Sequence, residues 1–302
     1  MADKRIGKKR PVGRDRVIFD ILSHIILLIL SALCLLPFLL VLSGSFSRQE
    51  DILTKGYRLI PVHVTTDAYK MLFRIPEELI RAYGVTILVT VVGTIFGLWF
   101  TSMAAYVISS KDFRYRYQVS FFFYFTSIFG GGLVPWYIFN TKYLHFHNNL
   151  IALILPILVN VTYLLILKSY MMNIPDSLYE SARLDGAGDF TIYWNIVIPL
   201  SKSGLATVGL FIALAYWNDW YNAMLYMNSS EKYPLQYMLY DLLQQTQALA
   251  RIASQAGIRV ESLPSNTLKL AMAVVATGPI ILLYPFVQKY FVKGVTIGSV
   301  KG

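Results

Sequence analysis

Residues 82–109 read AYGVTILVTVVGTIFGLWFTSMAAYVIS, an apolar run without Asp, Glu, Lys or Arg. A helix needs about 20 apolar residues to cross the hydrocarbon core of a bilayer, and this run exceeds that length. The chain has 302 residues, of which 56% are hydrophobic and only 15% charged, with a mean hydropathy of +0.52. That is more apolar surface than one water-soluble core covers, so the sequence predicts an all-α integral membrane protein.

Six such runs lie between charged or Pro-, Gly- and Asn-rich segments: 25–46, 82–109, 119–139, 150–167, 204–227 and 268–291. We therefore expect six transmembrane helices in a single membrane domain over 17–302, preceded by a basic tail over 1–16. The alternative for the first run is a cleaved signal peptide. A signal peptide has an apolar stretch of about 7 to 15 residues and a small-residue cleavage site. We expect the longer run here to be a retained helix.

Basic residues predict how the helices are oriented. They are concentrated in the tail 1–16, in the loop 111–116, in the segment 168–203 and at the C-terminal end, which are alternate sides of a six-span protein. Basic loops near span ends face the cytoplasm, so both termini should lie inside and the loop 228–267 outside. Anionic lipid headgroups account for this charge, including the net +10, so we do not expect nucleic acid as a partner.

The longest predicted cytoplasmic loop, 168–203, ends in SYMMNIPDSLYESARLDGAGDFTIYWNIVIPLSKS and is typical of two short helices. Ser177 and Glu180 have the spacing of a capping box. Gly186 suits the left-handed conformation that ends helices, and Pro199 would stiffen the joint to the fifth span. A polar helix pair between two spans indicates a docking site, and the alternative is a surface linker with good caps.

The spacing within this loop resembles the EAA loop of ABC-importer permeases, E-A-A-x-x-x-G-x9-I-x-L-P. Ser181 stands where that family usually has Ala, and Ile198 where it usually has Leu. The resemblance implies that the loop forms a coupling helix, which fits a groove on an ATPase subunit and carries its closure into the membrane. The residues to which it assigns this role are Glu180, Ser181, Ala182, Asp185, Gly186, Ile196 and Pro199.

The resemblance extends over most of the chain. Three further segments resemble the carbohydrate permeases related to the maltose permease MalG: GGLVPWYIFNTKYLHFHNNLIALILP (131–156), LFIALAYWNDWYNAMLYM (210–227) and PFVQKYFVKGVTIGSVKG (285–302). Within that family they most resemble the LplC and YtcP branch. This implies a type I ABC-importer permease fold, multi-pass in a bacterial cytoplasmic membrane, which imports a carbohydrate such as an oligosaccharide.

The same resemblance implies several partners: a second homologous permease, two copies of an ABC ATPase, and an extracellular solute-binding protein. It also implies that the C-terminal tail, 294–302, reaches between the two ATPase subunits through Gly298, Ser299 and Lys301. Small, flexible and basic residues are also typical of a frayed end, which is the alternative for this tail.

The sequence contains few groups that could carry chemistry. No G-x4-G-K-[ST] loop occurs, so ATP and Mg are expected on the partner ATPase and no cofactor on this chain. His145 and His147 have no Cys or carboxylate cluster nearby, and Cys34 is a lone cysteine within the first span, so we expect no metal site. We therefore expect a non-catalytic subunit.

Candidate contacts to the solute lie in the fifth span, at Trp217, Asn218 and Asp219, with Asn160 in the fourth span as a lesser candidate. An ionisable residue within a span is costly and therefore a candidate for function. Aromatic rings beside amides and carboxylates suit sugars. We favour Asn218 toward the solute and Asp219 toward a partner helix. Packing against the partner permease is the alternative for all of them.

Two other functions compete with carbohydrate transport. The first is a permease for peptides or other polar solutes. The second is a polytopic membrane enzyme or sensor, which would need a convergent set of titratable groups or a soluble output domain, and the sequence shows neither.

Overall fold

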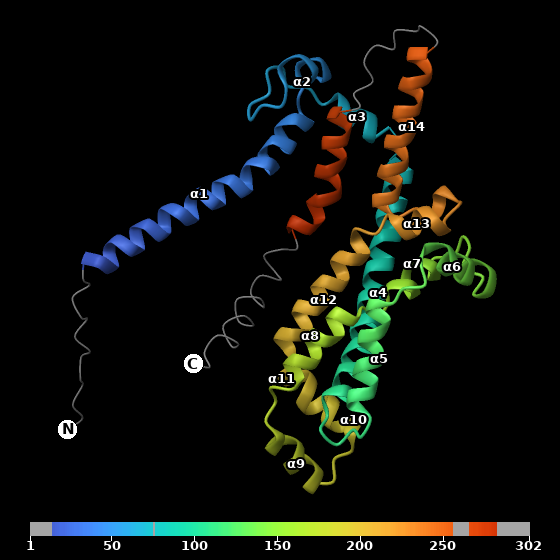
Figure 1. Cartoon of the computed structure of the whole chain (residues 1–302). Helices are drawn as coiled ribbons and strands as arrows, with labels where there is room; N and C mark the ends of the chain where they lie inside the picture. Colours follow the sequence, from blue (N-terminus) through green and yellow to red (C-terminus); the bar gives the residue numbers. More distant parts are fainter. Residues whose placement is uncertain (1–13, 75, 256–265, 283–302) are drawn as a thin grey trace. The chain divides into compact units, whose positions relative to one another are not determined.

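The computed structural model describes residues 14–74, 76–255 and 266–282, which are helical apart from turns, loops and one isolated bridge between Ser47 and Val64 (Figure 1). The chain divides into two compact units. One comprises Met1–Met71 with Arg259–Val274, and the other comprises Leu72–Ile258 with Val275–Gly302.

The first unit begins with the long helix α1 (Arg14–Ser45). Its membrane-length apolar window, within Val17–Ser45, has no buried residue, so its apolar side chains are available to lipid. Two short helices follow, α2 (Gln49–Lys55) and α3 (Asp67–Leu72). The Gln49 Oε1 atom accepts hydrogen bonds from the amides of Asn266 and Thr267, both at 3.2 Å, and so fixes the start of the helix Asn266–Leu282.

The second unit is built around α4 (Pro76–Ser109), which packs against α8 (Val161–Met171) and α12 (Lys202–Trp217). Gly93 allows the close approach of α4 and α12, because a Cβ atom there would lie 2.4 Å from the ring of Tyr216. The Tyr216 hydroxyl donates to the Ile154 carbonyl at 2.9 Å. Small residues on one face of a membrane helix commonly permit such packing.

Bends break two of the predicted spans, and a third bend lies just before the predicted fifth span. Arg116–Ile128 (α5) meets Leu133–Tyr143, which includes α6 (Leu133–Ile138), at 108° across the glycines 130–132. Ile151–Ile157, which includes α7 (Ile151–Ile154), meets α8 at 53°, and Asp189–Leu200 meets α12 at 84°. The described residues therefore contain two unbroken helices able to span a membrane, or up to five spans if each bent pair counts as one.

The first four predicted runs each overlap a long helix or a bent pair. The fifth, 204–227, is covered by α12 only as far as Trp217, and a separate short helix, α13 (Tyr221–Tyr226), forms its end. For the sixth, the structure shows a shorter apolar helix, Asn266–Leu282, and the rest of the run, 283–291, lies outside the described residues.

The polar connections contain the remaining helices. Between α8 and α12 lie α9 (Asp176–Leu184), α10 (Asp189–Ile192) and α11 (Ile198–Leu200). After α12 come α13 (Tyr221–Tyr226) and α14 (Leu235–Gln255), which occupies the predicted outward loop. The Leu235 amide donates to the Thr86 hydroxyl at 2.8 Å, so the first turn of α14 is attached to α4.

Candidate coupling helix and transport path

The E-S-A-x-x-x-G segment folds as helix α9 and the turn that follows it. α9 begins after Pro175, and its last turn is closed by Gly186, whose φ of +79° confirms the predicted left-handed conformation. The Ala187 amide donates to the Ala182 carbonyl at 2.9 Å across this turn. A residue with a Cβ atom adopts this backbone conformation only at a cost, so the glycine determines where the helix ends.

The predicted capping box is wrong. The N-cap of α9 is Pro175, and no side chain caps the helix, because α9 already begins at Asp176. Ser177 and Glu180 therefore lie inside the helix and not at its N-cap. The Glu180 side chain is exposed and lines a pocket.

The predicted coupling residues divide between two faces. Ala182 and Ile196 are half-buried against the hydrophobic core, together with Tyr179, whose burial raises the pKa of its phenol. The remaining predicted residues, Glu180, Ser181, Asp185, Gly186 and Pro199, are exposed. Leu184 at the end of α9 is 89% exposed, a large value for a leucine at a helix end. The segment thus has one face fixed to the protein and one face free.

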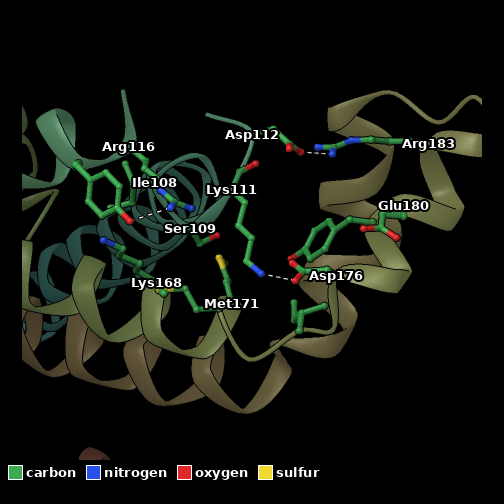
Figure 2. A pocket seen from close by; sticks show the side chains of 15 residues that line it. Ile108, Ser109, Lys111, Asp112, Arg116, Lys168, Met171, Asp176, Glu180 and Arg183 are labelled. Atoms are coloured by element: carbon green, nitrogen blue, oxygen red, sulfur yellow. Dashed lines mark hydrogen bonds and ion pairs between the residues drawn. The ribbon is translucent and has the colours of Figure 1, made fainter. Parts of the chain in front are cut away.

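Two ion pairs attach α9 to the loop between α4 and α5. Lys111 pairs with Asp176 at the start of α9, and Arg183 near its end pairs with Asp112 (Figure 2). Arg183 also lies 3.7 Å from Asp189. The hydrogen bond to Asp112 raises the pKa of the Arg183 guanidinium above its usual range. The loop therefore contacts α9 at both ends of the helix.

The sequence alone did not indicate that Lys111, Asp112, Asp176 and Arg183 form these ion pairs. The basic residues of the α4–α5 loop indicated only which side of the membrane the loop faces. Their carboxylate partners lie 65 and 71 residues away in the sequence, for Lys111 and Asp112 respectively. The only hint in the sequence was that 110–117, SKDFRYRY, contains both basic and acidic residues that could pair with another segment.

A pocket of about 460 Å³ lies beside α9, between the α4–α5 loop and the end of α8 (Figure 2). Both ion pairs are at its wall. Residues that line it come from α4, α5, α8, α9 and their connections, and they include Ile108, Ser109, Lys111, Asp112, Arg116, Lys168, Met171, Asp176, Glu180 and Arg183.

The candidate solute contacts are separated by the structure. Asn160 and Asp219 line one pocket of about 200 Å³, with Tyr163 and Asn222, which sequence analysis did not single out. Asp219 accepts hydrogen bonds from the backbone amide of Asn222 at 3.1 Å and from its side chain at 2.9 Å. Asn160 is the N-cap of α8 and accepts from the amide of Thr162 at 2.9 Å.

Trp217 and Asn218 lie elsewhere. Trp217 is buried, and its indole Nε1 donates to the Ala276 carbonyl at 3.1 Å, which is a packing contact within the chain. Asn218 is exposed, does not line that pocket, and accepts from Gln236 at 3.4 Å. Gly298, Ser299 and Lys301 of the predicted ATPase-contacting tail lie outside the described residues.

The described residues thus combine apolar helices of membrane length, bent helix pairs and an exposed polar helix between two of them, the architecture predicted for a transport permease. No protein-family model matches the chain. Two proteins of Bacillus subtilis (strain 168) are similar to it over nearly their whole length. The polygalacturonan/rhamnogalacturonan transport system permease protein YtcP is 39% identical and the protein LplC 38% identical, each over 94% of this chain and over 99% and 95% of their own lengths.

A solved structure agrees with these relatives. It is the crystal structure of a bacterial ABC transporter involved in the import of the acidic polysaccharide alginate. One of its chains matches with a TM-score of 0.74 and 28% identity, over 94% of this chain and 100% of that chain. The chain belongs to the MalG-like family of carbohydrate ABC-transporter permeases, and it is the membrane subunit of an ABC importer.

Proposed function

We propose that α9 is the coupling helix through which an ATPase subunit drives this permease. The observation that carries this proposal is the exposure of Leu184 at the tip of a helix whose opposite face is anchored. An apolar side chain that is 89% exposed gains free energy when a partner covers it, by about 1.5–3 kcal/mol for full burial of a leucine. Anchoring by the two ion pairs allows α9 to pass a displacement on to α4 and α5.

The proposed assembly has two homologous permeases, two copies of an ABC ATPase that bind ATP and Mg, and an extracellular solute-binding protein. This chain contributes six spans with both termini in the cytoplasm and supplies no catalysis itself. Its C-terminal residues Gly298, Ser299 and Lys301 would contact the ATPases. Family membership and the basic residues at alternate span ends support this arrangement.

The proposed solute is an oligosaccharide. Support comes from the names of relatives, which refer to polygalacturonan, rhamnogalacturonan and, for a permease 27% identical to this chain, arabinooligosaccharides. The pocket that joins Asn160 and Asp219 offers amide and carboxylate groups beside the ring of Tyr163, a set of groups that suits sugar hydroxyls and CH faces.

The test of coupling uses two substitutions at Gly186. No atom lies within 4 Å of a Cβ built there, so a large side chain meets no steric obstacle within the chain. The φ of +79° strains every residue other than glycine, so the amount of assembled complex is measured beside its ATP hydrolysis. Gly186→Trp should block docking and abolish solute-stimulated ATP hydrolysis by the purified complex. Gly186→Asn is the matched control, because Asn tolerates the left-handed conformation and is small. Normal hydrolysis by Gly186→Trp would exclude this role for α9.

A further inference from the structure

The pocket beside α9 contains two positive charges that no carboxylate neutralises. Lys111 and Arg183 are used in the ion pairs to Asp176 and Asp112. Arg116 and Lys168 also line the pocket, and among the described residues neither has a carboxylate oxygen within 4.0 Å. Both residues are half-buried and line the pocket.

The two cations are held in place by neutral hydroxyl groups. Lys168 Nζ donates to the Ser120 hydroxyl at 3.0 Å, and Arg116 Nη2 donates to the Tyr117 hydroxyl at 2.8 Å. Figure 2 shows Arg116 and Lys168 on the side of α5 and α8, whereas Glu180, the remaining carboxylate at the pocket wall, lies on α9. The two cations and Glu180 therefore belong to different walls of the pocket.

The position of the pocket along the spans indicates which anion it meets. α4 ends at Ser109, α5 begins at Arg116 and α8 ends at Met171, so the pocket lies at one end of three helices. The spans predicted from the sequence place this end at the cytoplasmic edge of the hydrocarbon core. Lipid phosphates occupy this depth, and basic pockets between helices at this level bind anionic headgroups. Ile108 and Met172 add an apolar wall, which a glycerol group and its first methylenes could contact.

We propose that Arg116 and Lys168 form a binding site for a phosphate group, and that its source is the headgroup of an anionic phospholipid. The guanidinium of Arg116 can donate two parallel hydrogen bonds to phosphate oxygens, and Lys168 supplies a point charge. Free phosphate carries the same chemistry, but the apolar wall favours a lipid. A lipid bound here contacts the pocket wall that α9 shares with α4, so its headgroup would reinforce the attachment of the coupling helix.

The experiment counts bound lipid on the intact complex by native mass spectrometry. The complex, purified in a neutral detergent, is titrated in separate arms with phosphatidylglycerol, phosphatidylcholine and inorganic phosphate. We expect saturable binding of phosphatidylglycerol, weakened about fivefold by Lys168→Gln and by Arg116→Gln, since each cation near the surface contributes about 1 kcal/mol. Arg114→Gln is the matched control, because Arg114 lies in the α4–α5 loop, two residues before Arg116, but does not line the pocket.

The outcomes distinguish an anionic phospholipid from free phosphate as the source of the bound phosphate group. Equal binding of phosphatidylglycerol by all variants, or equal binding of phosphatidylcholine, overturns the site. Binding of inorganic phosphate that displaces phosphatidylglycerol and depends on Lys168 supports the site and assigns it to a soluble phosphate. If Lys168→Gln does not assemble, Lys168→Arg should bind as the wild type does, and Arg116→Gln alone then decides.

Discussion

Arg183 on α9 forms an ion pair with Asp112, and the neighbouring Lys111 forms a second ion pair with Asp176 at the other end of α9. We predict that replacing the anion of the first pair with a cation uncouples the transporter. Asp112→Arg places two cations side by side and should lower solute-stimulated ATP hydrolysis about fivefold, the equivalent of about 1 kcal/mol, the upper range for exposed pairs. The double variant Asp112→Arg with Arg183→Asp should recover most of this loss.

Recovery should be incomplete, because an aspartate at position 183 would face Asp189, which lies 3.7 Å from the guanidinium of Arg183. The matched control is Asp67→Asn, which removes an ion pair to Lys70 in a part of the chain distant in sequence from α9 and should leave the rate unchanged. A double variant no more active than Asp112→Arg alone would show that the pair does not act through its charge.

Two glycines of α4 give a matched prediction for stability. At Gly93 a Cβ would lie 2.4 Å from the ring of Tyr216, whereas at Gly84 nothing lies within 4 Å. Gly93→Ala should destabilise the protein by about 1–3 kcal/mol, the usual cost of overpacking. Gly84→Ala should be neutral or stabilising by up to about 1 kcal/mol, because alanine favours the helix. Thermal unfolding of both variants in detergent checks this, and equal midpoints would contradict it.

Apolar runs predicted the helices well because crossing a bilayer imposes one simple requirement, a length of uncharged sequence. The bends between helices were harder to predict from the sequence. Glycines 130–132 marked the break of 108°, but the size of that angle depends on packing against neighbouring helices, which the sequence does not display. The break before α8 is marked by Asn160, which sequence analysis assigned to a span interior and the structure places at a helix cap.

The coupling segment shows the same limit at the level of single residues. Gly186 was predictable because its left-handed backbone is a local property. The capping box was predicted wrongly because Pro175 is the N-cap and the helix starts at Asp176, two residues too early for Ser177 to serve as its cap. Arg183 and Asp112 meet through the tertiary fold, so no local pattern could pair them.

Membrane sidedness can be tested with single cysteines in a Cys34→Ala background. Cysteines at Ser110 and Ser181 should resist an impermeant thiol reagent in intact cells, whereas one at Ser230 should react, because basic span ends place the first two inside. Ser181 and Ser230 are exposed residues, so accessibility does not limit labelling. Ser201 is unsuitable, since it is 1% exposed and would stay unlabelled on either side.

The control for this experiment is permeabilised cells, in which the cysteines at Ser110 and Ser181 should become reactive, the one at Ser181 more slowly wherever an ATPase subunit covers α9. Labelling of the cysteine at Ser181 from outside intact cells would place α9 on the outer side, and α9 could then not meet an ATPase.

The transport path gives the last prediction, because the structure separates residues that sequence analysis grouped. Asn160 and Asp219 share one pocket, and Asn218 does not line it. Asn160→Asp keeps a good N-cap for α8, so assembly should be normal, but it adds a second carboxylate beside Asp219 and should lower uptake at limiting sugar. Asp219→Asn removes an acceptor for Asn222 and should cost about 1 kcal/mol of stability.

Uptake of labelled oligosaccharide by proteoliposomes, with the amount of assembled complex measured separately, distinguishes the possible solute contacts. Asn218→Ala should transport normally if the shared pocket is the path. Loss of uptake in Asn218→Ala, with normal uptake in Asn160→Asp, would instead favour the prediction from sequence that Asn218 faces the solute. The Asn218 side chain accepts a long hydrogen bond of 3.4 Å from Gln236 and donates one of 2.9 Å to the Leu214 carbonyl of α12, so uptake by the alanine variant is compared per assembled complex.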